Sequence, residues 1–226
     1  MRYENIKKAS FIRRLNRFVA EIAIDNAISL CHVKNTGRCR ELLKPDAPIY
    51  VEVCLNPARK TPYTLIAVEK NGILFNIDSY APNLAAKEWI AEGGLGFVPS
   101  LLKSEAVYGN SRFDLYYEYG NIRGFVEVKG VTLEENGTAL FPDAPTLRGI
   151  KHIDELCKAK TDGYKASVLF VTQFSPVNAF SPNRKTHAAF GDALLRAQHA
   201  GVDILCRDCV VTADQMSIGK AVPVIL

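Results

Sequence analysis

The sequence has no long apolar run, and this absence excludes several classes of protein. No stretch reaches the roughly 18 apolar residues of a membrane-spanning helix. The opening segment, MRYENIKKASFIRR, lacks the apolar core of a secretory signal peptide. We therefore expect a cytoplasmic protein that does not associate with a membrane. There is also no internal repeat or low-complexity segment, and 48% hydrophobic with 23% charged residues is typical of a globular chain.

Closely spaced cysteines are also scarce. The six cysteines are scattered through 226 residues, a length that needs no disulfide bonds, so we expect reduced thiols. Only Cys206 and Cys209 form a CxxC pair, and His199 is the one histidine close to them in sequence. Zinc normally requires a second such pair or nearby histidines. Two interpretations remain for VDILCRDCVV: a zinc or redox site, or a buried strand with cysteine as a small apolar residue, which we favour.

Positive charge is concentrated in the first quarter of the chain. Residues 1–60 contain 12 basic and 6 acidic residues, whereas the remaining residues contain 16 and 18. Arginines cluster there close to Phe11 and Phe18. The five clustered arginines are Arg13, Arg14, Arg17, Arg38 and Arg40. Cations beside aromatic rings suit phosphate contacts next to stacked bases. A solvated basic face is the alternative interpretation.

Two kinds of hydrophobic pattern divide the chain. Before residue 83, segments such as RFVAEIAI and IYVEVCL alternate with a period of two, and Asn71-Gly72 marks a hairpin. Five or so short strands predict a small barrel over residues 1–82. NLAAKEWIAEGG then predicts a helix that stops at glycines, and strands and helices alternate after it. We predict an α/β domain over residues 83–226, with helices packed on its sheet.

One strand of this second domain carries an unusual arrangement of charge. In FVEVKG, Glu127 and Lys129 project to one side of the strand while Val126 and Val128 project to the other. Asp114 ends an apolar strand segment, and a hairpin around residues 119–121 would bring it antiparallel to Glu127. Three charged groups are therefore predicted to converge.

Two carboxylates this close repel each other unless a divalent cation neutralises them. Mg²⁺ or Mn²⁺ suits such oxygen ligands, and a nearby lysine can orient an attacking water. The chemistry indicated is phosphodiester hydrolysis. The alternative is an ion pair on the exposed face of an edge strand.

A helix after a second Asn-Gly hairpin adds cations to this region. We expect Pro145 and Thr146 to open it, with Arg148, Lys151 and His152 close together on one side. Such a face suits a phosphate clamp. His152 is alternatively a surface histidine.

Several motifs together resemble the sugar fermentation stimulation protein A (SfsA) family. They span roughly residues 11–205 and are RRLNRFVAEI, HVKNTGRCRELL, NPARKTPYTLI, SRFD, VEVKGVTL, FPDAPTLRGIKHIDEL and LFVTQF. The resemblance implies an N-terminal OB-like barrel and a C-terminal domain of the PD-(D/E)XK nuclease fold, with a mixed sheet flanked by helices. It also implies DNA binding and a metal-dependent nuclease activity.

The resemblance further assigns residues. The family's acidic-acidic-lysine signature falls on Asp114, Glu127 and Lys129, with the two carboxylates as metal ligands. Glu105 occupies the place where such nucleases often supply another carboxylate from the preceding helix. Candidates for lining the same cleft match the FPDA and RG-x2-H segments: Asp143, Thr146, Arg148, Gly149 and His152.

The chain departs from the family pattern in two places. Phe113 replaces the proline of the nuclease signature, and SPNRKTHAAF lacks an expected acidic-Pro pair. Two functions remain in competition: a nuclease acting on DNA or RNA, and a nucleic-acid-binding regulatory protein without turnover. The oligomeric state is open, with a homodimer among the alternatives.

Overall fold

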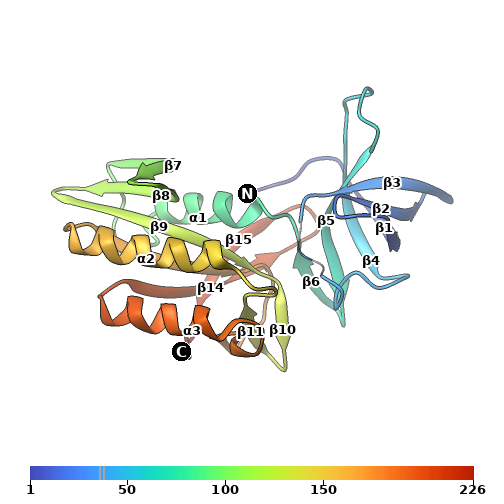
Figure 1. The fold of residues 1–226 in the computed structure, drawn as a ribbon. Helices are drawn as coiled ribbons and strands as arrows, with labels where there is room; N and C mark the ends of the chain where they lie inside the picture. Colours follow the sequence, from blue (N-terminus) through green and yellow to red (C-terminus); the bar gives the residue numbers. More distant parts are fainter. Residues whose placement is uncertain (36, 38) are drawn as a thin grey trace.

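The chain folds into a β-barrel joined to a mixed α/β domain, as a computed structural model describing residues 1–35, 37 and 39–226 shows (Figure 1). The barrel contains β1 (Ile6–Arg14), β2 (Val19–Ile24), β3 (Ala27–Val33), β4 (Pro48–Val53), β5 (Tyr63–Lys70) and β6 (Ile73–Asn76). Their order is β3-β2-β1-β4-β5-β6, and parallel pairing of β3 with β5 closes the first five strands. The predicted barrel is thus confirmed. Phe18 lies just before β2 and is exposed, whereas Phe11, the other ring named beside the arginines, is buried.

The second domain is built on a six-stranded sheet in the order β15-β14-β12-β9-β8-β7. The parallel strands β9, β12 and β14 form its centre, and the strands outside them are antiparallel. A small sheet, β10-β11-β13, lies beside it. The elements are α1 (Ala81–Ala91), β7 (Leu101–Tyr108), β8 (Ser111–Tyr119), β9 (Ile122–Val131), β10 (Leu133–Glu135), β11 (Thr138–Phe141), α2 (Leu147–Thr161), β12 (Lys165–Thr172), β13 (Ala179–Pro182), α3 (Arg184–His199), β14 (Asp203–Val211) and β15 (Met216–Ala221).

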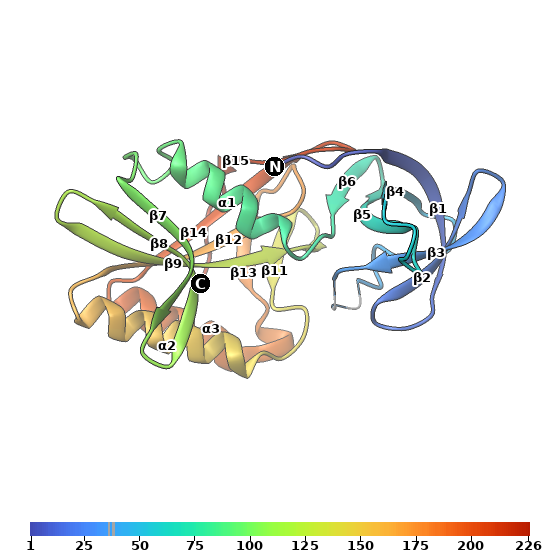
Figure 2. The same cartoon turned by 90° about the horizontal axis from the view of Figure 1, so that it is seen from above.

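Helices cover both faces of the large sheet (Figure 2). Helix α1 packs on one face, where Val126 and Val128 of β9 join its Ala85 and Ile90 in one core. Helices α2 and α3 pack together on the other face. The strand alternation predicted for FVEVKG is therefore confirmed, because its valines lie under α1 while Glu127 faces α2. No helix in the described residues is long and apolar enough to cross a membrane.

The CxxC pair lies within a buried strand. Cys206 and Cys209 are both free thiols in β14, and both are buried. Cys206 packs in the core on the α2–α3 side, whereas Cys209 packs in the core under α1. Because the two sulfurs belong to opposite faces of the sheet, they cannot share a zinc ion.

Helix α2 begins at Leu147, after the two residues predicted to open it. Thr146 is the N-cap residue and its hydroxyl accepts a hydrogen bond from the Gly149 N–H at 2.9 Å. Pro145 consequently lies before the cap and outside the first turn. A threonine cap satisfies one of the free N–H groups at the helix start, which fixes where the helix begins.

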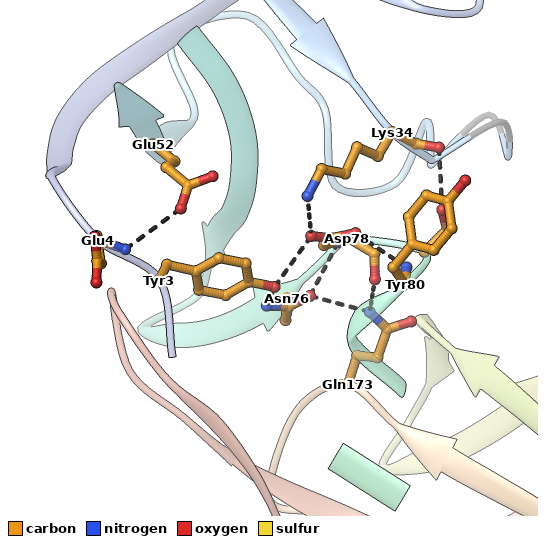
Figure 3. A network of polar contacts seen from close by, with 9 residues as sticks. Tyr3, Glu4, Lys34, Glu52, Asn76, Asp78, Tyr80 and Gln173 are labelled. Carbon is orange, nitrogen blue, oxygen red and sulfur yellow. Dashed lines mark hydrogen bonds and ion pairs between the residues drawn. The ribbon is translucent and has the colours of Figure 1, made fainter. Parts of the chain in front are cut away.

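A buried polar network joins the two domains (Figure 3). The Asp78 carboxylate is buried and forms an ion pair with Lys34 at 2.6 Å. The Gln173 amide donates to the Asn76 side chain at 3.1 Å and to the Asp78 carbonyl at 3.0 Å. Next to this network, the rings of Phe75 and Phe174 stack with centroids 4.4 Å apart. These contacts link β6 to the segment after β12 and so fix the barrel next to the end of β9.

We predict that Asp78→Ala destabilises the protein by about 3 kcal/mol, because it leaves the Lys34 ammonium without its partner in a largely buried site. Asp192→Ala is the matched control, since Asp192 of α3 pairs with Arg184 at 2.7 Å on the exposed surface. This control should cost less than about 1 kcal/mol. Urea unfolding measures both, and equal effects would contradict the prediction.

Candidate functional site

Strand β8 parts from β9 at Asp114. The β8–β9 ladder begins at Tyr119↔Ile122 and ends at Leu115↔Val126. Phe113 packs in the core with α2, yet Leu115 packs under α1, although regular alternation would put both on one face. The strand thus changes face at Asp114. From Glu127 onwards, the backbone of β9 is therefore not paired with the backbone of β8.

The Asp114 carboxylate occupies the place that β8 gives up. Its Oδ2 accepts a hydrogen bond from the Val128 N–H at 2.8 Å, and its Oδ1 accepts one from the Asn83 amide at 2.8 Å. Burial and, next, the charge of Glu127 raise the pKa of Asp114, against the opposing effects of Val128, Lys129 and Asn83. The predicted convergence of the two carboxylates is therefore present, and their repulsion is felt.

Glu127 is the most deeply buried of the predicted residues, at 2% exposure. Its Oε1 forms an ion pair with the Lys129 ammonium at 2.5 Å and a second contact with Nδ1 of His152. Burial favours the neutral acid, but the His152 hydrogen bond and the charge of Lys129 outweigh it, so the pKa of Glu127 is lowered. Its other oxygen, Oε2, is buried without a hydrogen-bond partner among the described residues.

His152 contacts Glu127 and does not lie on an exposed cationic face. It is 8% exposed, and its Nε2 lies 3.4 Å from Nε of the exposed Arg148. Because the guanidinium can only donate, Nε2 accepts and Nδ1 carries the proton that points to Glu127. The expectation that His152 contacts nucleic acid directly is corrected, because the His152 side chain is buried and contacts Glu127 instead. Arg148 remains at the surface.

Asn83 is a member of the site that the sequence did not single out. It lies in the first turn of α1, and its amide donates to Asp114. Its only signal was its place at the start of a predicted helix. Just before it, Pro82 lies 2.7 Å from the position that a Cβ on Gly130 would occupy. A glycine after Lys129 therefore lets α1 approach β9 closely.

Glu105 lies outside this cluster. It belongs to strand β7, so the expectation that a helix carries it is wrong. Its carboxylate is more than half exposed and pairs with Arg112 at 2.8 Å. The structure thus places Glu105 on the outer edge of the sheet, with a partner of its own.

The site suits a hard divalent cation. The unpaired Glu127 Oε2 is a buried anionic oxygen, which is costly to leave without a partner. A strand residue directs its N–H and C=O to the same side, so the Val128 carbonyl faces the Asp114 side as well. The described residues contain no group of three or more His, Cys, Asp or Glu side chains placed to hold a metal. A cation would therefore complete its shell with water or substrate, as Mg²⁺ commonly does.

The basic cluster of the barrel surrounds a hollow of about 570 Å³. Arg13, Arg14, Arg17 and Arg40 all line it, whereas Arg38 lies outside the described residues. Arg13 is paired with Glu21 at 2.6 Å. Arg17 and Arg40 are exposed and have no side-chain ion pair or hydrogen bond to other described residues. They are the arginines best placed to meet a ligand.

Arg14 has a different task from its neighbours. Its guanidinium donates to the backbone carbonyls of Asn35 and Gly37, each at 2.5 Å, and to that of Arg17 at 2.5 Å. Burial lowers the pKa of Arg14. We conclude that Arg14 organises the segment after β3, and that its place in the cluster is structural.

The other motif residues lie at or just before the N-terminal end of α2. Thr146 and Gly149 form the helix cap, and Gly149 has no room for a side chain because Thr146 and Phe190 crowd it. Asp143 is exposed and faces the barrel, with its Oδ2 2.9 Å from where a Cβ on Gly37 would lie. It therefore lines the gap between the domains.

The chain combines an OB-like barrel with an α/β sheet that carries a buried Glu127 and a partly buried Asp114. The family model described as "Sugar fermentation stimulation protein RE domain" matches residues 80–215, and "SfsA N-terminal OB domain" matches residues 12–77. The chain belongs to the sugar fermentation stimulation protein A (SfsA) family, as its motifs suggested. The predicted fold class is confirmed with it.

Relatives match over nearly their whole length. A sugar fermentation stimulation protein homolog of Ruminiclostridium cellulolyticum is 51% identical over 99% of both chains. A homolog of Desulfitobacterium hafniense is 49% identical over 99% of this chain and 98% of its own. The solved structure of Pyrococcus furiosus SfsA in complex with Ca²⁺ is 29% identical, with a TM-score of 0.89 and coverage of 100% and 98%.

We predict opposite pH trends for two isosteric variants. A lowered pKa means that ionised Glu127 stabilises the fold above its ordinary value of 4.5, and that this contribution is lost as the pH falls through the folded pKa. Glu127→Gln should be most destabilising near pH 7 and approach wild type in acid. Asp114 has a raised pKa, so its ionisation costs stability above that pKa, and Asp114→Asn should gain relative to wild type as the pH rises.

Urea unfolding in steps from pH 7 to pH 3 without added metal measures both trends, because the Glu127 trend develops below pH 4.5. The two variants serve as each other's control, because each replaces one carboxylate of the same site by an amide. Stability differences that move in the same direction with pH would contradict the assignment.

Proposed function

We propose that this protein is a divalent-metal-dependent nuclease that binds nucleic acid through its barrel. The observation that carries the proposal is the buried, unpaired Oε2 of Glu127 beside Asp114. No hydrogen bond from the described residues satisfies this oxygen. It is suited to a cation that neutralises both carboxylates.

Asp114 and Glu127 would hold Mg²⁺ or Mn²⁺. When bound, such an ion lowers the pKa of a coordinated water and offsets the charge that develops on the phosphate. The Lys129 ammonium lies beside Glu127 and interacts electrostatically with Asp114. From there it can donate a hydrogen bond to an attacking water. His152 holds Glu127 in place and excludes water from its far side. The relative from Pyrococcus furiosus is in complex with Ca²⁺, another hard cation that takes oxygen ligands.

The barrel supports the binding half of the proposal. OB barrels bind single strands through aromatic stacking and backbone charge. Here Arg17 and Arg40 line a hollow of about 570 Å³, and Phe18 is exposed just beyond Arg17. Arg13 also lines the hollow, with its guanidinium paired to Glu21.

We predict that the purified protein cleaves nucleic acid in Mg²⁺ or Mn²⁺, that EDTA abolishes cleavage, and that Glu127→Gln lowers the rate at least a hundredfold. An amide in this place keeps the volume but removes the charge that holds the cation. The assay uses labelled single- and double-stranded DNA and RNA. The matched control is Glu105→Gln, which changes a carboxylate outside the cluster and should leave the rate unchanged.

Cleavage that survives both EDTA and Glu127→Gln would end this proposal. Lys129→Met provides a second variant, because it removes the donor to water but keeps both carboxylates. Its rate should fall while metal binding, measured by calorimetry, is retained.

A second function, nucleic-acid binding without turnover and with a regulatory role, is favoured by one observation. Arg17 and Arg40, which are exposed and have no side-chain partner among the described residues, lie on the barrel, apart from the carboxylates. In that case binding would persist in Lys129→Met, and no metal would bring about cleavage. The assay above separates the two functions.

We predict that Arg17→Ala with Arg40→Ala weakens nucleic-acid binding and flattens its salt dependence. Each lost phosphate contact should lower the slope of log K against log salt by about one. Fluorescence anisotropy at several salt concentrations measures it. Arg123→Ala is the control, since Arg123 lies at the start of β9, at the hairpin end of the sheet, over the Tyr164 ring. An unchanged slope in the double variant would contradict a role for the barrel.

A further inference from the structure

The carboxylate site is recessed, and this restricts the form of its substrate. Glu127 is buried and the Lys129 side chain is only 17% exposed. Beside them, the β8–β9 ladder ends at Leu115 and Val126. Duplex DNA is stiff over its persistence length and keeps its stacked bases inside. A single strand bends locally and can insert one phosphate at a time.

Exposed apolar side chains lie next in sequence to residues that hold the site. Tyr80, the N-cap residue of α1, is 67% exposed and lies one helical turn before Asn83, which holds Asp114. Leu84 follows Asn83 and is also exposed. On α2, Leu147 is 79% exposed and precedes Arg148. Exposed aromatic and apolar side chains suit unstacked bases, whereas the outside of a duplex presents phosphates.

Tyr80 also lies between the barrel and the carboxylates. Its backbone N–H donates to Asp78 at 3.0 Å, and the Ser79 hydroxyl donates to the Lys34 carbonyl at 3.1 Å. Figure 3 shows the Tyr80 ring near Lys34, with its hydroxyl directed away from Asp78. Lys34 leads out of β3 towards Gly37 and Arg40, both of which line the arginine hollow. A strand bound on the barrel would therefore pass Tyr80 before reaching Asp114.

A smaller cavity of about 170 Å³ separates the domains beside this route. Gly37 of the barrel lines it together with Gly130, the residue after Lys129. Asp143 lines it as well, and its carboxylate disfavours a phosphate there. The strand would consequently keep its phosphates on the side of Lys129, with its bases toward the exposed side chains of Tyr80, Leu84 and Leu147.

We infer that the substrate of the proposed nuclease is a single-stranded nucleic acid, or the single-stranded arm of a branched one. The inference rests on the proposed function. The strand lies across the arginine hollow of the barrel, one base stacks on Tyr80, and the neighbouring phosphate reaches Asp114, Glu127 and Lys129. Base–aromatic stacking tolerates any sequence, so little sequence preference is expected.

The first test measures binding in EDTA, where cleavage is absent. Fluorescein-labelled oligothymidylate, oligouridylate and a duplex of equal length are compared by anisotropy. Wild type should bind a single strand more tightly than the duplex, and the DNA and RNA arms tell which sugar it accepts. Tyr80→Ala should weaken single-strand binding about tenfold, the size of one lost stack, while Tyr80→Phe retains it. Tyr119→Ala, another exposed tyrosine but at the β8–β9 hairpin, should have no effect.

The second test maps cleavage in Mn²⁺ on a duplex that carries a single-stranded tail. Cuts confined to the tail or its junction support the inference. Equal cutting of the duplex, or equal binding of both forms with no effect of Tyr80→Ala, overturns it while leaving the nuclease proposal standing. Absence of cleavage on every substrate overturns the proposed function, and the inference with it, whatever the binding data show.

Discussion

The chemistry of this protein depends on one buried anion. Glu127 has almost no contact with solvent, and a carboxylate in that environment stays ionised only if opposite charge and hydrogen-bond donors compensate it. The Lys129 ammonium and the Nδ1–H of His152 supply this compensation, and both contact Oε1. The second oxygen is held in a fixed direction without a partner of its own. The fold therefore stabilises the charge of Glu127 while leaving its Oε2 without a hydrogen bond from the described residues.

The separation of β8 from β9 gives that unused oxygen a neighbour. If the ladder had continued past Leu115, a β8 backbone group would have met the Val128 N–H. Instead the Asp114 carboxylate accepts this hydrogen bond and stands next to Glu127. Asn83 then fixes its orientation from α1. Elements from both faces of the sheet thus meet at one irregularity, and the buried network around Asp78 sets the barrel beside it.

Local patterns predicted much of this arrangement. A period of two identified the strand faces at Val126 and Val128, and Asn-Gly pairs located hairpins at residues 71–72 and 136–137, whose residues do have positive φ. The sequence could not show what depends on three-dimensional packing. His152 reads as one of several cations on a helix, and only packing of α2 on the sheet shows that it is buried against Glu127. Arg14 likewise looks like its neighbours until the carbonyls of Asn35 and Gly37 are placed around it. Glu105 resembled a ligand by its place in the family pattern, which does not show that it lies on the edge strand β7 and pairs with Arg112.

The distribution of charge explains why two domains are needed for the proposed function. Two carboxylates repel phosphate, and burial together with the charge of Glu127 raises the pKa of Asp114. A site of this kind contributes little affinity for nucleic acid, so attraction has to come from elsewhere. In the proposed function, the exposed arginines of the barrel would provide it at a distance, where they do not neutralise the carboxylates. Had Arg17 or Arg40 stood beside Glu127, they would have paired with its second oxygen and closed the place that a cation requires.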